Sequence, residues 1–151
     1  MTAKSYLSQI RKCDTLIRNK LQEVQSLKEL ILSVTSVLKD DVVSGGGDSD
    51  KVGTIVCKIV ELQEEINEQI DRLVDLKDEA MKIIDGINGA LCDVLYRRYF
   101  CYETWEQIAV GMGYTYQWVC KLHGKALLEV DKLLKEREIV ERDGVECGAG
   151  V

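Results

Sequence analysis

Apolar residues recur every seven positions between residues 10 and 38. One row consists of Ile10, Ile17, Val24, Ile31 and Leu38, and its companion row consists of Cys13, Leu27 and Val34, with Lys20 as an interruption. Two such rows, three or four residues apart, form one face of an α-helix. The pattern therefore predicts a helix over residues 3–38. Further leucines beside the rows widen this face beyond what one partner helix covers.

A second helix of the same kind is predicted over residues 52–87. Its rows are Val52, Ile59, Ile66, Leu73, Ala80 and Ile87, and Ile55, Leu62, Leu76 and Ile83, with Gln69 as the polar exception. The intervening residues 39–51 are rich in glycine, serine and aspartate, which predicts a flexible loop. A loop of this length returns the chain antiparallel. Residues 1–88 are therefore predicted to form a long, coiled-coil-like helical hairpin.

Glycines mark the end of this hairpin and the start of a second domain at residues 89–140. We expect one helix at about 90–100, a short helix after Thr104, and a last helix from Thr115 to about Val140. The glycine-rich residues 141–151 are predicted to be a disordered tail. Because the chain contains no proline, the predicted fold class is all-α.

The distribution of charge is more informative than the formal net charge of −6. Residues 1–88 carry 12 basic and 16 acidic side chains, and residues 128–151 carry 4 and 7. Residues 89–127 carry 4 basic and 3 acidic side chains and are the only part that is not acidic. An acidic chain is not a general nucleic-acid coat protein, but this segment is the end that local charge favours for DNA.

Nothing in the sequence indicates metal, cofactor or catalytic chemistry. The six cysteines contain no CxxC pair and there is a single histidine, so we expect reduced thiols that pack as small apolar residues. A hairpin that turns near residue 45 places Cys13 opposite Lys77, far from Cys57. His123 has no nucleophile or acidic partner at a spacing typical of catalysis, and a structural role is expected. We therefore predict that the protein is not an enzyme.

The apolar runs are too short to cross a bilayer. The first residues enter an amphipathic pattern at once, which is unlike a signal peptide. A cytoplasmic protein with no membrane partner is expected.

Residues 104–126 have the spacing of a helix-turn-helix. Thr104 with Gln107 suits a capping box at the start of the first helix. Ala109 is small where the two helices cross, and Gly113 suits the positive φ of the turn between them. The positions expected to be buried are Ile108, Met112, Tyr114, Val119 and Leu122. Such a motif presents the outer face of its second helix to a DNA major groove.

The candidate DNA-binding residues follow from this register. Thr104 and Thr115 cap the two helices and leave N–H groups for a phosphate. With Val119 and Leu122 turned inward, the outward residues are Tyr116, Gln117, Cys120, Lys121, Gly124 and Lys125. Glutamine can read an adenine edge, and lysine can contact guanine or phosphate. Arg97 and Arg98 could add phosphate contacts, or one of them could tie its helix to neighbouring carboxylates. Trp105 and Trp118 are expected to pack, with Trp118 close enough to the outward face to reach a sugar-phosphate.

The segment RYFCYETWEQIAVGMGYTYQWVCKLHGKAL, from Arg98 onward, resembles region 4 of bacterial sigma-70 factors. Nearly the whole chain resembles a group of small phage and prophage proteins, through KVGTIVCKIVELQEEINEQIDRLVDLKDEAM and GYTYQWVCKLHGKAL. This resemblance implies a phage transcriptional regulator similar to activators of late phage genes. Gln117 and Cys120 stand where the family pattern favours arginine or histidine, and no promoter-melting segment is present.

We therefore expect a regulator that binds double-stranded promoter DNA, aided by a second copy or by RNA polymerase. The hairpin would supply a homodimer contact or a polymerase contact. The alternative is a protein-interaction module that docks on RNA polymerase or another partner without touching DNA.

Overall fold

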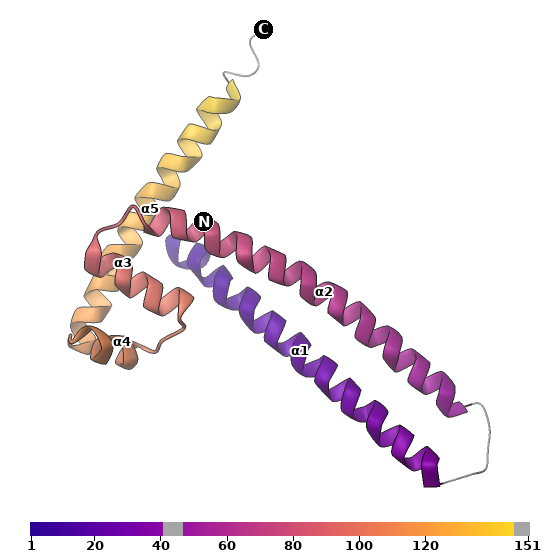
Figure 1. The fold of residues 1–151 in the computed structure, drawn as a ribbon. Helices are drawn as coiled ribbons and strands as arrows, with labels where there is room; N and C mark the ends of the chain where they lie inside the picture. Colours follow the sequence, from indigo (N-terminus) through magenta and orange to yellow (C-terminus); the bar gives the residue numbers. More distant parts are fainter. Residues whose placement is uncertain (41–46, 147–151) are drawn as a thin grey trace. The chain divides into compact units, whose positions relative to one another are not determined.

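The computed structural model describes residues 1–40 and 47–146, and these residues are almost entirely helical (Figure 1). The elements are α1 (Ala3–Asp40), α2 (Gly47–Ile84), α3 (Gly89–Leu95), η1 (Tyr96–Phe100), α4 (Trp105–Met112) and α5 (Tyr116–Glu146). The described ranges contain no strand, so the prediction of an all-α protein is confirmed. Within the same ranges, no helix has a stretch long and apolar enough to cross a bilayer.

The chain divides into two compact units. The long-helix unit is Cys13–Val74, and the C-terminal unit is Met1–Lys12 together with the part of Asp75–Val151 that the structure describes. The C-terminal unit therefore takes in residues 1–12 and 75–88 as well as the predicted segment 89–140.

In the long-helix unit, α1 and α2 run antiparallel and bury the predicted heptad rows. Cys13 and Ile17 of α1 and Leu62 and Ile66 of α2 are buried. The two polar interruptions of the rows have partners on the opposite helix: Lys20 forms an ion pair with Glu65, and Gln69 accepts from Cys13. A heptad seam tolerates such residues when each finds a partner across it.

The register of the two helices differs from the expected one. Cys13 Sγ lies 3.4 Å from the backbone oxygen of Gln69, so the prediction that it lies opposite Lys77 is wrong. That prediction placed the turn at the midpoint of the loop. In the observed register Cys13 and Gln69 lie opposite each other across the seam. Both residues occupy positions in the predicted rows of their helices.

The helices are longer than predicted at three of their ends. α1 continues to Asp40 and α2 begins at Gly47, so only residues 41–46 of the predicted flexible loop remain, and they lie outside the described residues. α5 continues to Glu146, which corrects the prediction of disorder for residues 141–146. No proline interrupts this stretch, a lone helical glycine costs only about 1 kcal/mol, and an ion pair between Arg137 and Glu141 spans one turn. Residues 147–151 lie outside the described residues.

The C-terminal unit has its own core, built from both ends of the sequence. Leu7 of α1, Ile84 of α2, Leu95 of α3 and Val130 of α5 are all buried. The backbone N–H of Ala3 donates to a carboxylate oxygen of Asp131 at 2.7 Å and ties the start of α1 to α5. This core holds the helices from which the candidate site is built.

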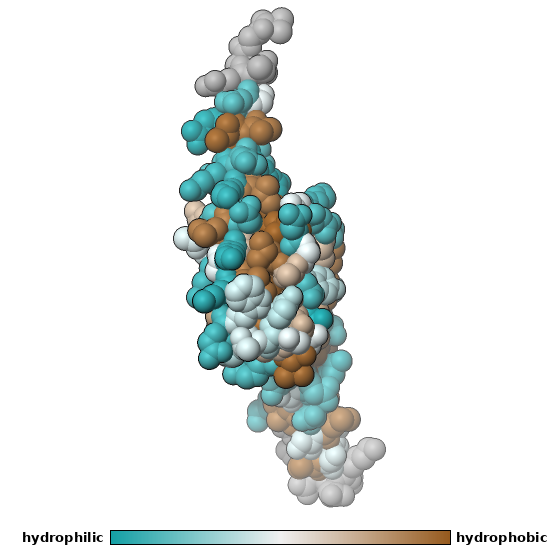
Figure 2. Space-filling model, turned by 90° about the vertical axis from the view of Figure 1, so that its left-hand side faces the viewer, coloured by the Kyte–Doolittle hydropathy of each residue, from teal (hydrophilic) through white to brown (hydrophobic). Residues whose placement is uncertain are grey.

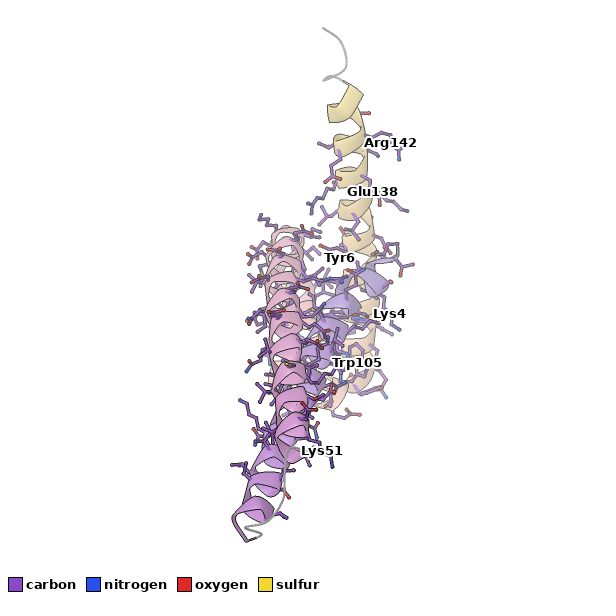
Figure 3. The ribbon with its side chains drawn as sticks, turned by 90° about the vertical axis from the view of Figure 1, so that its right-hand side faces the viewer. Lys4, Tyr6, Lys51, Trp105, Glu138 and Arg142 are labelled. Carbon is purple, nitrogen blue, oxygen red and sulfur yellow. The ribbon has the colours of Figure 1, made fainter. Side chains whose placement is uncertain are left out.

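Lys4 and Tyr6, near the start of α1, also belong to this unit (Figure 3). Tyr6 is half-buried, and burial is the main cause that raises the pKa of its phenol, followed by the charge of Glu79. By contrast, residues 135–144 of α5, which include Glu138 and Arg142, are all exposed. The buried part of α5 therefore ends before residue 135.

Candidate nucleic-acid interface

The start of α4 is fixed by the predicted capping box. The backbone N–H of Gln107 donates to Thr104 Oγ1 at 3.2 Å, and the backbone N–H of Thr104 donates to Gln107 Oε1 at 2.9 Å. This reciprocal pair satisfies two of the N–H groups that a helix start leaves open. Thr104 and Gln107 are exposed, but their hydrogen-bonding groups already serve the helix. A phosphate at this end would meet the remaining N–H groups of the first turn.

The turn between α4 and α5 has the conformation expected from its glycine. Gly113 has φ of 69° and ψ of 31°, the left-handed region, and its N–H bonds back to the last turn of α4. Thr115 then caps α5, because its Oγ1 accepts from the backbone N–H of Trp118 at 3.2 Å. The sequence Gly-Tyr-Thr therefore ends one helix and starts the next within three residues.

A small apolar cluster holds α3, α4 and α5 together. Its buried members are Val94, Ile108, Ala109, Val119 and Leu122, with Met112 and Trp105 packed against them. Four of the five positions predicted for this core are buried or partly buried as expected. Tyr114 is not, since 42% of it is exposed. It follows the left-handed Gly113, which turns the chain away from the core before α5 begins.

The predicted outer face of α5 is exposed at every position. This face consists of Tyr116, Gln117, Cys120, Lys121, Gly124 and Lys125. The Cys120 thiol, one turn along, is the main cause that raises the pKa of the Tyr116 phenol, and the carboxylate of Glu106 adds to the effect. Glu106 of α4 thus places one negative charge beside an otherwise neutral and basic surface.

The lysines of this face have no carboxylate partner among the described residues. The Lys125 ammonium lies 5.8 Å from the ring centroid of Trp118, a cation–π contact at the edge of the face. Lys121 makes no ion pair with any described residue. Gly124 has open space where a Cβ would stand, so another molecule can approach the backbone there closely. The face therefore offers two available cations, one amide and a bare stretch of backbone.

Arg97 and Arg98 contact other groups of the protein and do not belong to the outer face of α5. Arg97 Nε lies 3.1 Å from a carboxylate oxygen of Asp93, and its Nη1 lies 3.5 Å from one of Glu103. Arg98 donates to the backbone oxygen of Glu103 at 2.9 Å, and its guanidinium carbon lies 4.3 Å from the ring centroid of Trp105. Of the two roles that the sequence left open, the structure shows the tie to neighbouring groups, for both arginines.

An aromatic cluster around His123 is the arrangement that sequence reasoning did not find. His123 Nε2 lies 2.8 Å from the hydroxyl of Tyr99, and the ring stands edge-on to Trp105 with centroids 4.7 Å apart. Burial, followed by the charges of Arg98 and Lys4, lowers the pKa of His123 to about 4. The imidazole is therefore neutral at pH 7 and packs against Tyr99 and Trp105.

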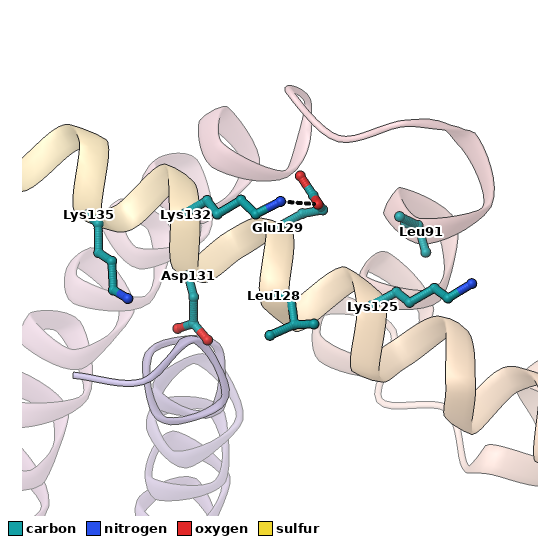
Figure 4. A pocket seen from close by; sticks show the side chains of 7 residues that line it. All are labelled: Leu91, Lys125, Leu128, Glu129, Asp131, Lys132 and Lys135. Atoms are coloured by element: carbon teal, nitrogen blue, oxygen red, sulfur yellow. Dashed lines mark hydrogen bonds and ion pairs between the residues drawn. The ribbon is translucent and has the colours of Figure 1, made fainter.

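A shallow hollow of about 390 Å³ lies along α5 beyond the predicted face (Figure 4). It is lined by Leu91, Lys125, Leu128, Glu129, Asp131, Lys132 and Lys135. Leu128 is 63% exposed, and apolar side chains reach the protein surface among hydrophilic ones (Figure 2). The spacing of residues 125, 128, 132 and 135 puts them on one side of a helix, a signal that the sequence contained.

Two carboxylates in this hollow are already engaged. Glu129 pairs with Lys132 at 2.9 Å, and Asp131 accepts from Ala3. Lys125 and Lys135 have no such partner among the described residues. The hollow thus combines an apolar floor with cations that remain available to a negatively charged partner.

The part of the chain that the structure describes shows neither a metal-binding cluster nor a disulfide. No three histidine, cysteine, aspartate or glutamate residues of this part are grouped to hold a metal ion. Its cysteines are all free, with Cys13 buried and Cys57, Cys101 and Cys120 exposed. Comparison of the chain with models of known protein families, with curated proteins and with solved structures gave no match.

Proposed function

We propose that the protein is a DNA-binding transcriptional regulator of phage or prophage genes, acting in the cytoplasm through a helix-turn-helix formed by α4 and α5. One observation carries the proposal. The capped α4, the left-handed Gly113 and the capped α5 hold an exposed face with no carboxylate of its own, on a chain that is acidic elsewhere. The resemblance to sigma-70 region 4 supports the same function.

In this proposal α5 enters the major groove with its first three turns. Gln117 reads a base edge, since a glutamine amide can bond an adenine at two points. Lys121 and Lys125 contact guanine or phosphate, and Gly124 allows close approach of the backbone. Because Arg97 and Arg98 are engaged within the protein, the face supplies few cations. Binding is therefore weak for one copy alone and gains from a second copy or from RNA polymerase.

The direct test is fluorescence anisotropy of labelled duplexes from prophage promoters, titrated with the full-length chain in about 50 mM salt. We expect Gln117→Ala to reduce the preference for a specific duplex by about 5- to 100-fold while leaving non-specific binding unchanged. Lys28→Ala, an exposed change in α1, serves as the control. No binding of any duplex at low salt would contradict the proposal.

The hollow along α5 favours a second candidate, a module that docks on RNA polymerase without touching DNA. Its exposed Leu128 and its available Lys125 and Lys135 suit a partner with an apolar side chain flanked by carboxylates. Purified bacterial RNA polymerase that retains the chain after nuclease treatment, and loses it with Leu128→Glu, would support this candidate. Loss of retention on nuclease treatment would favour DNA binding instead.

A further inference from the structure

α2 carries a second stripe of residues at helical spacing, away from the row that packs on α1. The stripe consists of Val56, Val60, Gln63, Asn67, Ile70 and Val74. All six are exposed: 45% of Val56, 48% of Val60, 41% of Ile70 and 52% of Val74 remain accessible. None is charged, although charged residues are frequent elsewhere on this helix. An unbroken apolar and amide stripe over five turns is a contact surface.

The stripe has the same residue spacing in both directions along α2. Its successive spacings are four, three, four, three and four residues, so that its centre is at the level of Glu65. Its chemistry is symmetric about the same point: Val56 corresponds to Val74, Val60 to Ile70, and Gln63 to Asn67. In an antiparallel two-fold interface such a stripe meets its own copy with like residues opposite each other, because each contact from one copy to the other is repeated in reverse.

We propose that this stripe binds the same stripe of a second copy, with the two α2 helices antiparallel about a two-fold axis at the level of residue 65. Val56 then meets Val74 of the second copy, and Val60 meets Ile70. At the centre, the amide of Gln63 faces that of Asn67 and can both donate and accept, and it does so twice by symmetry. A polar pair inside an apolar seam fixes its register.

Acidic residues flank the stripe on one side. The residues that follow its six members are Cys57, Glu61, Glu64, Glu68, Asp71 and Asp75. Two parallel helices would place this flank against the opposite flank of the second copy, whereas two antiparallel helices place the same flank of both copies on one side of the interface. In the antiparallel pair Asp71 lies near the level of Cys57 of the second copy, Glu64 near that of its own copy, and Glu61 near that of Glu68. The antiparallel orientation therefore rests on the symmetric spacing of the stripe and not on charge.

The exposed apolar residues of α1 do not form a comparable surface. Leu16, Leu30 and Val37 lie on one side with Glu23 between the first two, and Leu21 and Leu32 lie on the other with Lys28 between them. A seam of six side chains from each copy is a small interface, near the lower limit of about 1,000 Å² in total that specific association needs. We therefore expect a dissociation constant in the micromolar range.

The inference deepens the expected self-association and stands whether or not α5 binds DNA. Its first test uses full-length chains whose native cysteines are replaced by alanine. Chains with Val56→Cys and chains with Val74→Cys carry different tags and are treated with a short bis-maleimide at tens of micromolar. We expect crosslinks in the mixture and almost none in either sample alone. Crosslinks within one sample, or none in the mixture, would overturn the proposal.

A second test uses charge and needs no crosslinker. Val60→Lys and Ile70→Glu should each raise the dissociation constant at least tenfold in sedimentation equilibrium, and mixing them should restore a heterodimer through the new Lys–Glu pair. Leu32→Glu, a change at a more exposed position off the stripe, should leave the dimer intact. Because every substituted side chain is exposed, helicity by circular dichroism should not change. A wild-type chain that stays monomeric at 100 µM, or a mixture that does not associate, would contradict the inference.

These outcomes are separate from the test of DNA binding. A dimer that binds no duplex would remove the proposed function and keep the interface. A monomer that binds duplex would remove the proposed interface and keep the proposed function.

Discussion

The hydroxyl of Tyr99 and Nε2 of His123 lie 2.8 Å apart, and this contact joins η1 to the first third of α5. Trp105 of α4 stands against the same imidazole. One neutral histidine thus contacts two of the elements that surround it. Its environment disfavours the protonated form, because burial and the nearby Arg98 both lower the pKa of the ring.

Protonation of His123 should therefore lower the free energy of unfolding at acidic pH. The pKa of this ring is about 4 in the folded state and about 6.5 in the unfolded state, so the unfolded chain takes up the proton first as the pH falls. The contribution of the neutral ring is complete above about pH 6.5 and is lost between about pH 6.5 and pH 4. Allowing for solvent at a half-buried ring, we expect a loss of about 1–2 kcal/mol.

The measurement is urea unfolding at pH 7 and pH 4.5 for the wild type and His123→Gln, which keeps a polar partner for Tyr99. The difference in free energy of unfolding between the two pH values should be smaller in the variant by about 1–2 kcal/mol. Equal differences would show that His123 does not control this range. The carboxylates of both proteins titrate alike, so they cancel in the comparison.

Arg98 should stabilise the C-terminal unit through its contacts with Trp105 and the backbone of Glu103. Arg98→Ala removes a cation–π contact and a charged hydrogen bond, and we expect a loss of about 1–3 kcal/mol. Arg11→Ala, at an exposed site of the same unit, should change the free energy of unfolding by less than about 0.5 kcal/mol. Thermal or urea unfolding of the three proteins decides between this role and a free, DNA-facing arginine.

Substitution of two glycines of this region by alanine should change the free energy of unfolding in opposite directions. Gly113 has φ of 69°, so Gly113→Ala should destabilise the protein by about 1–2 kcal/mol. Gly124 lies inside α5 with open space at its Cβ position, so Gly124→Ala should stabilise it by about 0.5–1 kcal/mol. If α5 enters a DNA groove, the more stable Gly124→Ala should also bind duplex less tightly. Unchanged or tighter binding would argue against close backbone approach at this position.

Lys121 should contribute to DNA binding through phosphate or base contacts. Lys121→Ala should weaken binding at low salt and reduce the slope of log K against log salt by about 1. Lys28→Ala removes the same charge from an exposed site on α1 and should leave the slope unchanged. Equal slopes for all three proteins would place Lys121 outside the interface.

Local signals in the sequence determined much of the fold. The heptad rows of Ile17 and Ile66 predict long helices because their period matches the helical repeat. The pair Thr104 and Gln107 predicts a cap, and Gly113 predicts a turn, because each depends on groups within three or four residues along the chain. The outward positions of α5, from Tyr116 to Lys125, follow from the same periodicity once Val119 is taken as buried.

The tertiary structure alone decided which partners distant groups have. It placed Cys13 beside Gln69, turned Tyr114 outward, engaged Arg97 and Arg98 with Asp93, Glu103 and Trp105, and enclosed His123. Helical periodicity gives the direction of a side chain about its own axis and says nothing of what stands opposite. Charge, burial and pKa depend on that opposite surface, and it is set only when the helices pack.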